Sequence, residues 1–115
     1  FKAAWHPLQG CWGQYCTQIT GNYLFHSSPY NSPNKNDLSY RLYNQLGTVC
    51  SHGCVRLTVA DAKWIYDNCP LGTTVSIYNA SSLPVPKPSA PWLDISSPTR
   101  GWDPTDPDPA NPWNK

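Results

Sequence analysis

Long apolar runs and clustered charges are both missing from this sequence, and each absence excludes a class of protein. No stretch approaches the roughly 18 apolar residues that cross a membrane, and the N-terminus lacks the basic and apolar regions of a signal peptide. The eight basic and seven acidic side chains are spread thinly, with no run of lysine or arginine. We therefore expect no membrane span in this chain and no nucleic-acid partner.

Cysteine, in contrast, is abundant. Five cysteines in 115 residues would be unusual for a reduced cytosolic protein without a metal site, so we expect an oxidising, extracellular setting. The number is odd, and two disulfides would leave a fifth thiol that needs a role. In this setting we infer that an export signal has been removed, or that the chain is a piece of a longer protein.

The composition changes sharply near residue 79. Residues 79–115 hold nine of the 13 prolines, whereas all cysteines and histidines precede them. We predict a folded domain over residues 1–79 and an extended tail over residues 80–115, because proline removes the donors that helices and sheets need. A disordered linker and a strap along the domain surface both remain open, and three tryptophans favour the strap.

The sequence of residues 1–79 predicts short strands and one or two short helices. Residues 19–27 are rich in β-forming side chains, and residues 37–46 place leucines four apart. Thr58 followed by Asp61 is a capping-box pattern that begins a helix, and residues 73–78 follow that helix as a strand. The expected fold is mostly β or α+β. Its core would be so small that we expect disulfide bonds to stabilise it.

The segment TVCSHGCVRL, residues 48–57, carries the most chemistry. Cys50, His52 and Cys54 alternate, so on a strand they would share one face and offer metal ligands. Structural zinc, however, usually takes four ligands from two closely spaced pairs, and the second pair would have to come from the widely spaced Cys11 and Cys16. We therefore expect no metal and no cofactor.

Cys54 is better explained as a nucleophile. A reactive thiolate needs a base, donors for the oxyanion that forms on attack, and room for the substrate. Gly53 provides room, and the backbone N–H groups of His52, Gly53 and Cys54 can converge as an anion nest. His26, at the end of the predicted strand, is the candidate base, because His52 is too near Cys54 in sequence to face its sulfur.

The motif SHGCVRL, with a preceding strand that ends in His26 and Ser27, resembles the signature of the YkuD family of L,D-transpeptidases. These are bacterial cell-wall enzymes, and the chain resembles the exported members from Gram-positive Firmicutes over residues 1–79 and more loosely over the tail. The resemblance implies a YkuD-like β-sandwich that lacks its first strands here, unless a second chain or segment supplies them. It also implies an insertion, because 24 residues separate His26 from Ser51.

The resemblance assigns roles residue by residue. It implies that Cys54 is the nucleophile, that His26 is the base and that Ser27 orients its imidazole. The resemblance also implies an oxyanion hole formed by His52, Gly53 and Cys54. The substrate contacts would come from Tyr30, Ser51 and Arg56. Arg56 would brace the loop or meet a substrate carboxylate.

The implied reaction is acyl transfer from a peptidoglycan tetrapeptide stem. Cys54 would attack the carbonyl of the third residue, release D-Ala, and pass the acyl group to a second stem, giving a 3→3 cross-link in the extracellular cell wall. Acylation by carbapenems is expected. With water or a protein amine as acceptor, the same chemistry would give an L,D-carboxypeptidase or protein attachment, and a non-catalytic, disulfide-stapled wall-binding module is the alternative from another class.

With Cys54 reserved as the nucleophile, sequence proximity favours two disulfides among the other cysteines. We predict Cys11 with Cys16 and Cys50 with Cys69. The second bond would fasten the SHGC loop to the end of the following helix and keep its amide donors rigid.

Overall fold

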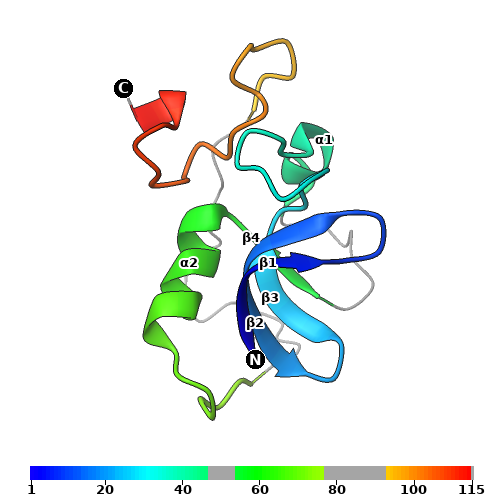
Figure 1. The fold of residues 1–115 in the computed structure, drawn as a ribbon, viewed down its shortest axis with the longest axis vertical. Helices are drawn as coiled ribbons and strands as arrows, with labels where there is room; N and C mark the ends of the chain where they lie inside the picture. Colours follow the sequence, from blue (N-terminus) through cyan, green and yellow to red (C-terminus); the bar gives the residue numbers. More distant parts are fainter. Residues whose placement is uncertain (47–53, 77–92, 115) are drawn as a thin grey trace, which may run out of the picture.

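A four-stranded sheet, in the order β1-β2-β3-β4, forms the body of the protein (Figure 1). The computed structural model describes residues 1–46, 54–76 and 93–114. The first three strands pair antiparallel, whereas β4 pairs parallel with β3. Their bounds are Lys2–Pro7 for β1, Trp12–Thr20 for β2, Tyr23–Ser27 for β3 and Val55–Leu57 for β4.

Two tight turns join the antiparallel strands. In the β1–β2 turn, the N–H of Leu8 donates to the carbonyl of Cys11 at 2.8 Å, and Gly10 adopts φ +74°. In the β2–β3 turn, Gly21 adopts φ +53°, which a residue without a side chain does at low cost. The predicted strand over residues 19–27 is therefore divided: its first two residues end β2, and β3 begins only at Tyr23.

The helix predicted after Thr58 is confirmed as α2, Val59–Asn68. Thr58 is its N-cap, and its side chain accepts from the N–H of Asp61 at 3.4 Å. The helix ends at Asn68 with Cys69 as its C-cap, and its residues contact β2, β3 and β4. With one sheet and short helices, the described residues confirm the predicted mostly β or α+β fold. None of their helices has the length and apolar character needed to cross a membrane.

Other sequence expectations were wrong in detail. The helix predicted over residues 37–46 is a single turn, α1, Tyr40–Tyr43. It starts late because Leu38 instead forms an isolated bridge with Tyr30 and donates its N–H to the carbonyl of Gly101. Residues 73–76 are not a strand, and the last two residues of that predicted element lie outside the described residues. The strand β1 and most of β2 were not anticipated.

In the described residues, the fully buried members of the hydrophobic core cluster come from segments outside the four strands. They come from the β3–α1 connection, from α1, from the start of α2 and from the tail: Tyr30, Leu38, Tyr43, Val59 and Leu93. Trp5, Trp12 and Tyr15 pack against them from the first two strands. The tail thus contributes one of the core side chains, Leu93, which is 0% exposed.

We call residues 93–114 the C-terminal strap. It lies over the N-terminal end of α2 and beside α1 (Figure 1). Four of its residues, each followed by proline, form a repeated turn in which a side-chain oxygen accepts from the N–H two residues on, at 2.8–3.1 Å: Asp103, Asp106, Asp108 and Asn111. Asx side chains replace the hydrogen bonds that proline removes, so this proline-rich segment keeps one defined path.

We expect Leu93→Ala to lower the free energy of unfolding by about 2–5 kcal/mol, because it leaves a cavity in a fully buried position. Denaturation by urea, followed by fluorescence, would measure this change. Leu71→Ala is the matched control, since Leu71 is 67% exposed and should change stability by no more than about 0.5 kcal/mol. Equal stabilities for the two variants would contradict the placement of the strap in the core.

Candidate active site

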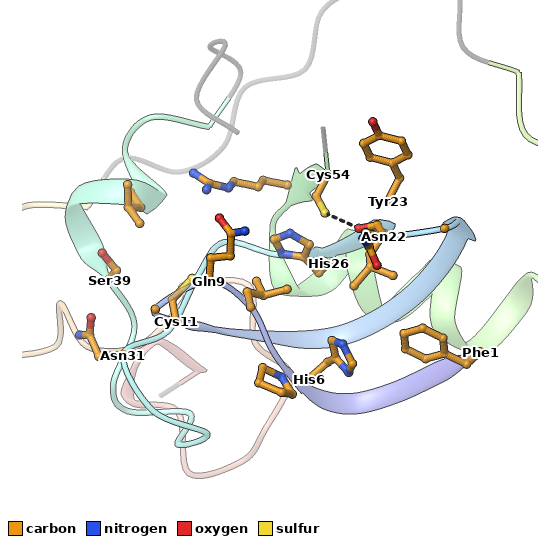
Figure 2. Close-up of a pocket in the computed structure, with 17 residues that line it drawn as sticks. Phe1, His6, Gln9, Cys11, Asn22, Tyr23, His26, Asn31, Ser39 and Cys54 are labelled. Atoms are coloured by element: carbon orange, nitrogen blue, oxygen red, sulfur yellow. Dashed lines mark hydrogen bonds between the residues drawn. The ribbon is translucent and has the colours of Figure 1, made fainter. Parts of the chain in front are cut away.

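The parallel pairing of β3 with β4 brings the predicted nucleophile and base to one cavity. In this register His26 is paired with Arg56, and Cys54 immediately precedes β4. All three residues line a cavity of about 640 Å³ (Figure 2). Residues that are 28 positions apart in sequence therefore meet through backbone pairing.

The Cys54 thiol is half-buried at the edge of this cavity. Its Sγ donates to the backbone carbonyl of Asn22, at 3.5 Å, in the β2–β3 turn (Figure 2). Asn22 and Tyr23 also line the cavity. The turn thus places a carbonyl acceptor beside the thiol.

His26 has the orientation and protonation state that a general base needs. Its Nδ1 lies 2.5 Å from the backbone carbonyl of Ser27. Because a carbonyl only accepts, Nδ1 carries the proton and Nε2 keeps a lone pair. The side chain is 1% exposed, and burial lowers its pKa; the contact with Ser27 opposes this, and the Arg56 charge lowers the pKa further. His26 is therefore neutral near pH 7.

Ser27 connects the base to the neighbouring strand. Besides offering its carbonyl to His26, it accepts through Oγ from the N–H of Gln14 at 3.0 Å and donates to the carbonyl of Ser28 at 2.9 Å. All of these groups are buried. The backbone that orients the imidazole is thereby tied to β2.

Gly13 in β2 lets the sheet approach His26 closely. A Cβ at this position would lie 3.1 Å from the Cβ of His26 and 3.0 Å from the Sγ of Cys16. Such contacts are tighter than ordinary packing, so a side chain here would displace the imidazole or the thiol. The glycine therefore leaves the space in which His26 sits.

Arg56 brings a permanent positive charge to the cavity. Its Nε and Nη1 atoms are buried and have no hydrogen-bond partner. No aspartate or glutamate is among the described residues that line the cavity. Buried guanidinium donors without an acceptor are costly, and a carboxylate is the ligand that such planar donors fit best.

Tyr30 was predicted as a wall of the substrate cleft, and the structure contradicts this. The residue is 0% exposed, belongs to the hydrophobic core and does not line the cavity. It forms isolated bridges with Trp12 and Leu38, and its ring packs edge-on against Trp5 at 5.0 Å between centroids. These backbone pairings turn the ring inward.

The predicted disulfide between Cys11 and Cys16 is not formed, and both residues are thiols. Cys16 lies within β2 and Cys11 directly before it. An extended strand rises about 3.3 Å per residue, so five residues span about 16 Å, far beyond the roughly 7 Å that a disulfide allows between Cα atoms. Proximity in sequence misled the prediction because the segment is a strand.

The two thiols instead have separate environments. Cys16 is fully buried beside Gly13, and burial raises the pKa of its thiol to about 12. Cys11 lines the cavity; burial raises its pKa, and the charge of Arg56 opposes that shift. Neither thiol is therefore strongly ionised at neutral pH.

Several predicted site residues lie outside the described residues: Cys50, Ser51, His52 and Gly53. Their roles in the oxyanion hole, in substrate contact and in the Cys50–Cys69 bond stay predictions, although Cys69 itself is recorded as a thiol at the end of α2. Within the described ranges, no three His, Cys, Asp or Glu side chains are grouped so as to bind a metal ion.

Sequence reasoning missed the β1–β2 turn as part of the site. Gln9, Gly10 and Cys11 line the cavity opposite the β2–β3 turn. The signal was present, since a glycine stands between two short segments that contain aromatic side chains. It was overlooked because Cys11 was assigned to a disulfide.

The thiol assignments are testable by alkylation without reductant and peptide mapping. We expect both Cys11 and Cys16 to be alkylated after denaturation, and Cys16 to be protected in the native protein because it is 0% exposed with a raised pKa. A cross-linked Cys11–Cys16 peptide would contradict the structure. The same map would show whether Cys50 and Cys69 are joined.

Comparisons with known proteins identify the family of the chain. The family model described as the L,D-transpeptidase catalytic domain, YkuD, matches residues 3–77. A Bacillus subtilis (strain 168) protein named "Putative L,D-transpeptidase YciB" is 47% identical over 57 residues, which cover 50% of this chain and 28% of that protein. No solved structure matched. The chain, with Cys54 and His26 inside the matched region, belongs to the YkuD family of L,D-transpeptidase catalytic domains.

Proposed function

We propose that the protein forms 3→3 cross-links in peptidoglycan by cysteine acyl transfer. The observation that carries this proposal is the β3–β4 register, by which Cys54, a neutral His26 and Arg56, whose buried Nε and Nη1 have no hydrogen-bond partner, line one cavity. The family match supports the reaction class. Because the chain spans 28% of the length of its Bacillus relative, the exact reaction is our inference.

In the first half-reaction, Nε2 of His26 takes the proton of the Cys54 thiol. The thiolate attacks the carbonyl carbon of the third stem residue, a diamino acid, and the C–N bond to D-Ala breaks as the tetrahedral intermediate collapses. The imidazolium returns its proton to the leaving amine. D-Ala leaves, and the stem remains on Cys54 as a thioester.

In the second half-reaction, the side-chain amine of another stem attacks the thioester carbonyl. His26 takes a proton from this amine, the C–S bond breaks, and the Cys54 sulfur leaves as thiolate. A new amide joins the third residues of two stems. The first step exchanges an amide for a thioester and the second exchanges that thioester for a new amide. The overall reaction therefore conserves the number of amide bonds, and the cross-link needs no external energy source.

The negative charge that develops on the attacked oxygen needs donors fixed in advance. We assign these donors to the backbone N–H groups of His52, Gly53 and Cys54, of which the first two lie outside the described residues. Ser51 would complete this loop. The assignment rests on the sequence motif.

Arg56 would bind a carboxylate of the donor stem. Its unpartnered Nε and Nη1 atoms face no acidic side chain among the described cavity residues, so a carboxylate from the substrate would satisfy them. A tetrapeptide stem carries such a group at its terminal D-Ala. The proposed setting is the extracellular cell wall, where the stems are found.

Exposure to a carbapenem, followed by intact mass measurement, tests the nucleophile. We expect an adduct of one drug molecule on the native protein and none on Cys54→Ala, because the strained lactam carbonyl takes the place of the stem carbonyl. Cys11→Ala is the matched control, since it removes a thiol from the same cavity and should leave the adduct in place. Absence of an adduct on folded protein would refute the proposal.

Incubation with a tetrapeptide stem, followed by analysis of the products, identifies the acceptor of the acyl group. Release of D-Ala with formation of a stem dimer supports the transpeptidase, and release of D-Ala with only a tripeptide would identify an L,D-carboxypeptidase. Labelling of an added protein amine would identify attachment of proteins to the wall. A protein that binds stems without releasing D-Ala would be a non-catalytic binding module.

The pH dependence of Cys54 acylation tests His26 as the base. Its pKa lies below 6.5 because burial disfavours the imidazolium, so the acidic limb of the rate should have its inflection below pH 6.5. Arg56 also lowers this pKa, and Arg56→Gln should therefore move the inflection to higher pH. An inflection that stays fixed in Arg56→Gln would contradict the electrostatic coupling between the two residues.

A further inference from the structure

The family match ends at residue 77, so it assigns no role to the C-terminal strap. We propose that the strap is a positioning element for the reactive thiol: Asp103 and Thr105 fix the first turn of α2, and through it β4 and Cys54. The effect of the strap on catalysis rests on the proposed function. The contacts between the strap and α2, from which the proposal is argued, are independent of that function.

The first observation is that the strap caps α2 from a distance. The N–H of Val59 donates to Oδ2 of Asp103 at 3.0 Å, and the N–H of Ala60 donates to Oγ1 of Thr105 at 3.0 Å. The local N-cap, Thr58, reaches only the N–H of Asp61, at 3.4 Å. Two of the first three helical N–H groups are therefore satisfied by residues more than 40 positions away in sequence.

Asp103 and Thr105 are themselves held in one arrangement. Asp103 is 0% exposed, and its Oδ1 accepts from both the N–H and the hydroxyl of Thr105, at 2.8 and 2.7 Å. The Thr105 hydroxyl thus donates to Asp103 while it accepts from Ala60. The side-chain amide of Asn111 also stabilises this turn, because it donates to the carbonyls of Asp103 and Asp106, both at 2.9 Å.

Cys54 depends on this cap because β4 is weakly anchored by itself. The strand has three residues, and among the strands of the described residues it pairs with β3 alone. A single residue, Thr58, separates it from α2. Short parallel pairing contributes few hydrogen bonds, so the position of the first turn of α2 constrains β4 and the thiol that precedes it.

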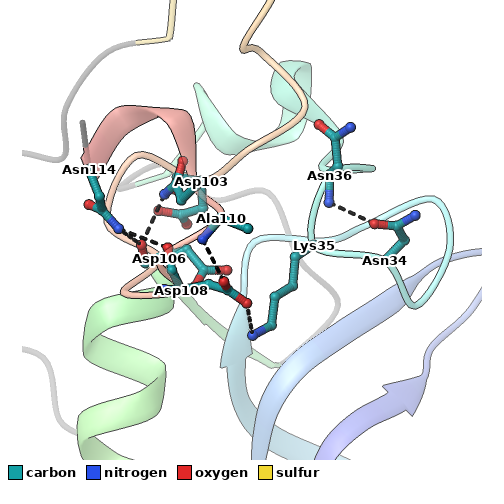
Figure 3. A network of polar contacts seen from close by, with 9 residues as sticks. Asn34, Lys35, Asn36, Asp103, Asp106, Asp108, Ala110 and Asn114 are labelled. Atoms are coloured by element: carbon teal, nitrogen blue, oxygen red, sulfur yellow. Dashed lines mark hydrogen bonds and ion pairs between the residues drawn. The ribbon is translucent and has the colours of Figure 1, made fainter.

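The strap also contacts the opposite side of the cavity. The segment of residues 31–46 supplies Asn31, Ser39 and Leu42 to the cavity lining. From this segment, Nζ of Lys35 forms an ion pair with Asp108 at 2.8 Å (Figure 3). The strap therefore bridges the segment that forms one wall and the helix that follows the thiol.

Further contacts fit the strap tightly against this wall. The guanidinium of Arg100 lies 4.5 Å from the centroid of the Tyr40 ring, and the side chain of Asn44 exchanges two hydrogen bonds with the backbone of Leu93. At Gly101 a Cβ would lie 2.4 Å from the carbonyl oxygen of Asn36. Only glycine fits at that distance, so the backbone of the strap lies directly against the wall segment.

The central test compares Thr105→Val with Thr105→Ser in the full chain. Valine keeps the shape of threonine but loses the acceptor for Ala60 and the donor to Asp103, whereas serine keeps both. We expect valine to slow acylation of Cys54 by a carbapenem roughly ten- to a hundredfold, because small misplacement of a reacting group is costly. Serine should stay within about threefold of the native rate.

Each rate is measured well below the melting temperature of its variant, with hydrogen exchange at Val59 and Ala60 recorded in parallel. Faster exchange at Ala60 together with slower acylation supports the positioning role. Faster exchange with acylation at the native rate would overturn it, because the strap would then stabilise α2 without placing the thiol.

If the native protein is not acylated at all, the proposed function fails and the positioning role is judged separately. The pH profile of Cys54 alkylation by iodoacetamide reports the surroundings of the thiol without any enzymatic reaction. A profile shifted in Thr105→Val but not in Thr105→Ser supports the positioning role. Superimposable profiles for all three proteins would overturn it.

If Thr105→Val does not fold, a variant that perturbs the strap less provides the test. Lys35→Met removes the ion pair with Asp108 but leaves the Asx turns intact, and Lys35→Arg restores the charge. Both side chains are partly exposed, so the fold should survive. Slower acylation or a shifted alkylation profile in Lys35→Met, with recovery in Lys35→Arg, supports the proposal. Native acylation and a native alkylation profile in Lys35→Met would refute it.

Discussion

The parallel pairing of β3 with β4 is the interaction on which the site depends. It covers three residue pairs, yet its register places Cys54 beside the cavity that His26 lines. Parallel strands need a long crossover. In the described part of the crossover between β3 and β4, Asn31, Ser39 and Leu42 line the cavity. The same crossover contains the spacing between His26 and Ser51 from which an insertion is expected, so this connection also contributes to one wall of the site.

A pairing this short is supported from both ends. Gly13 lets β2 approach His26, and Ser27 ties the backbone that orients the imidazole to Gln14. At the other end, Asp103 and Thr105 cap the helix that follows β4. Burial disfavours the imidazolium and keeps His26 neutral, while Arg56 remains charged in the same cavity with no hydrogen-bond partner at its buried Nε and Nη1.

How far the sequence predicts the structure varies by element. The capping pattern at Thr58 and Asp61 fixed the start of α2 because N-caps are local interactions. The leucine spacing in residues 37–46 overpredicted a helix, since Leu38 pairs with Tyr30 and with the strap, which are distant in sequence. Cys11 and Cys16 were paired by proximity, but the strand they occupy separates them. The Pro-rich composition of the tail is compatible with both a linker and a strap, so the sequence does not distinguish them.

By itself, the sequence determined the family and named Cys54 as the candidate nucleophile and His26 as the candidate base, because the motif around Cys54 and the short segment that ends in His26 are each local patterns. The tertiary structure decided the protonation of His26, the removal of Tyr30 from the cleft wall and the entry of Cys11 into it. It also decided that the strap caps α2. These features depend on burial and on contacts between distant segments, and neither is encoded in any local pattern of residues.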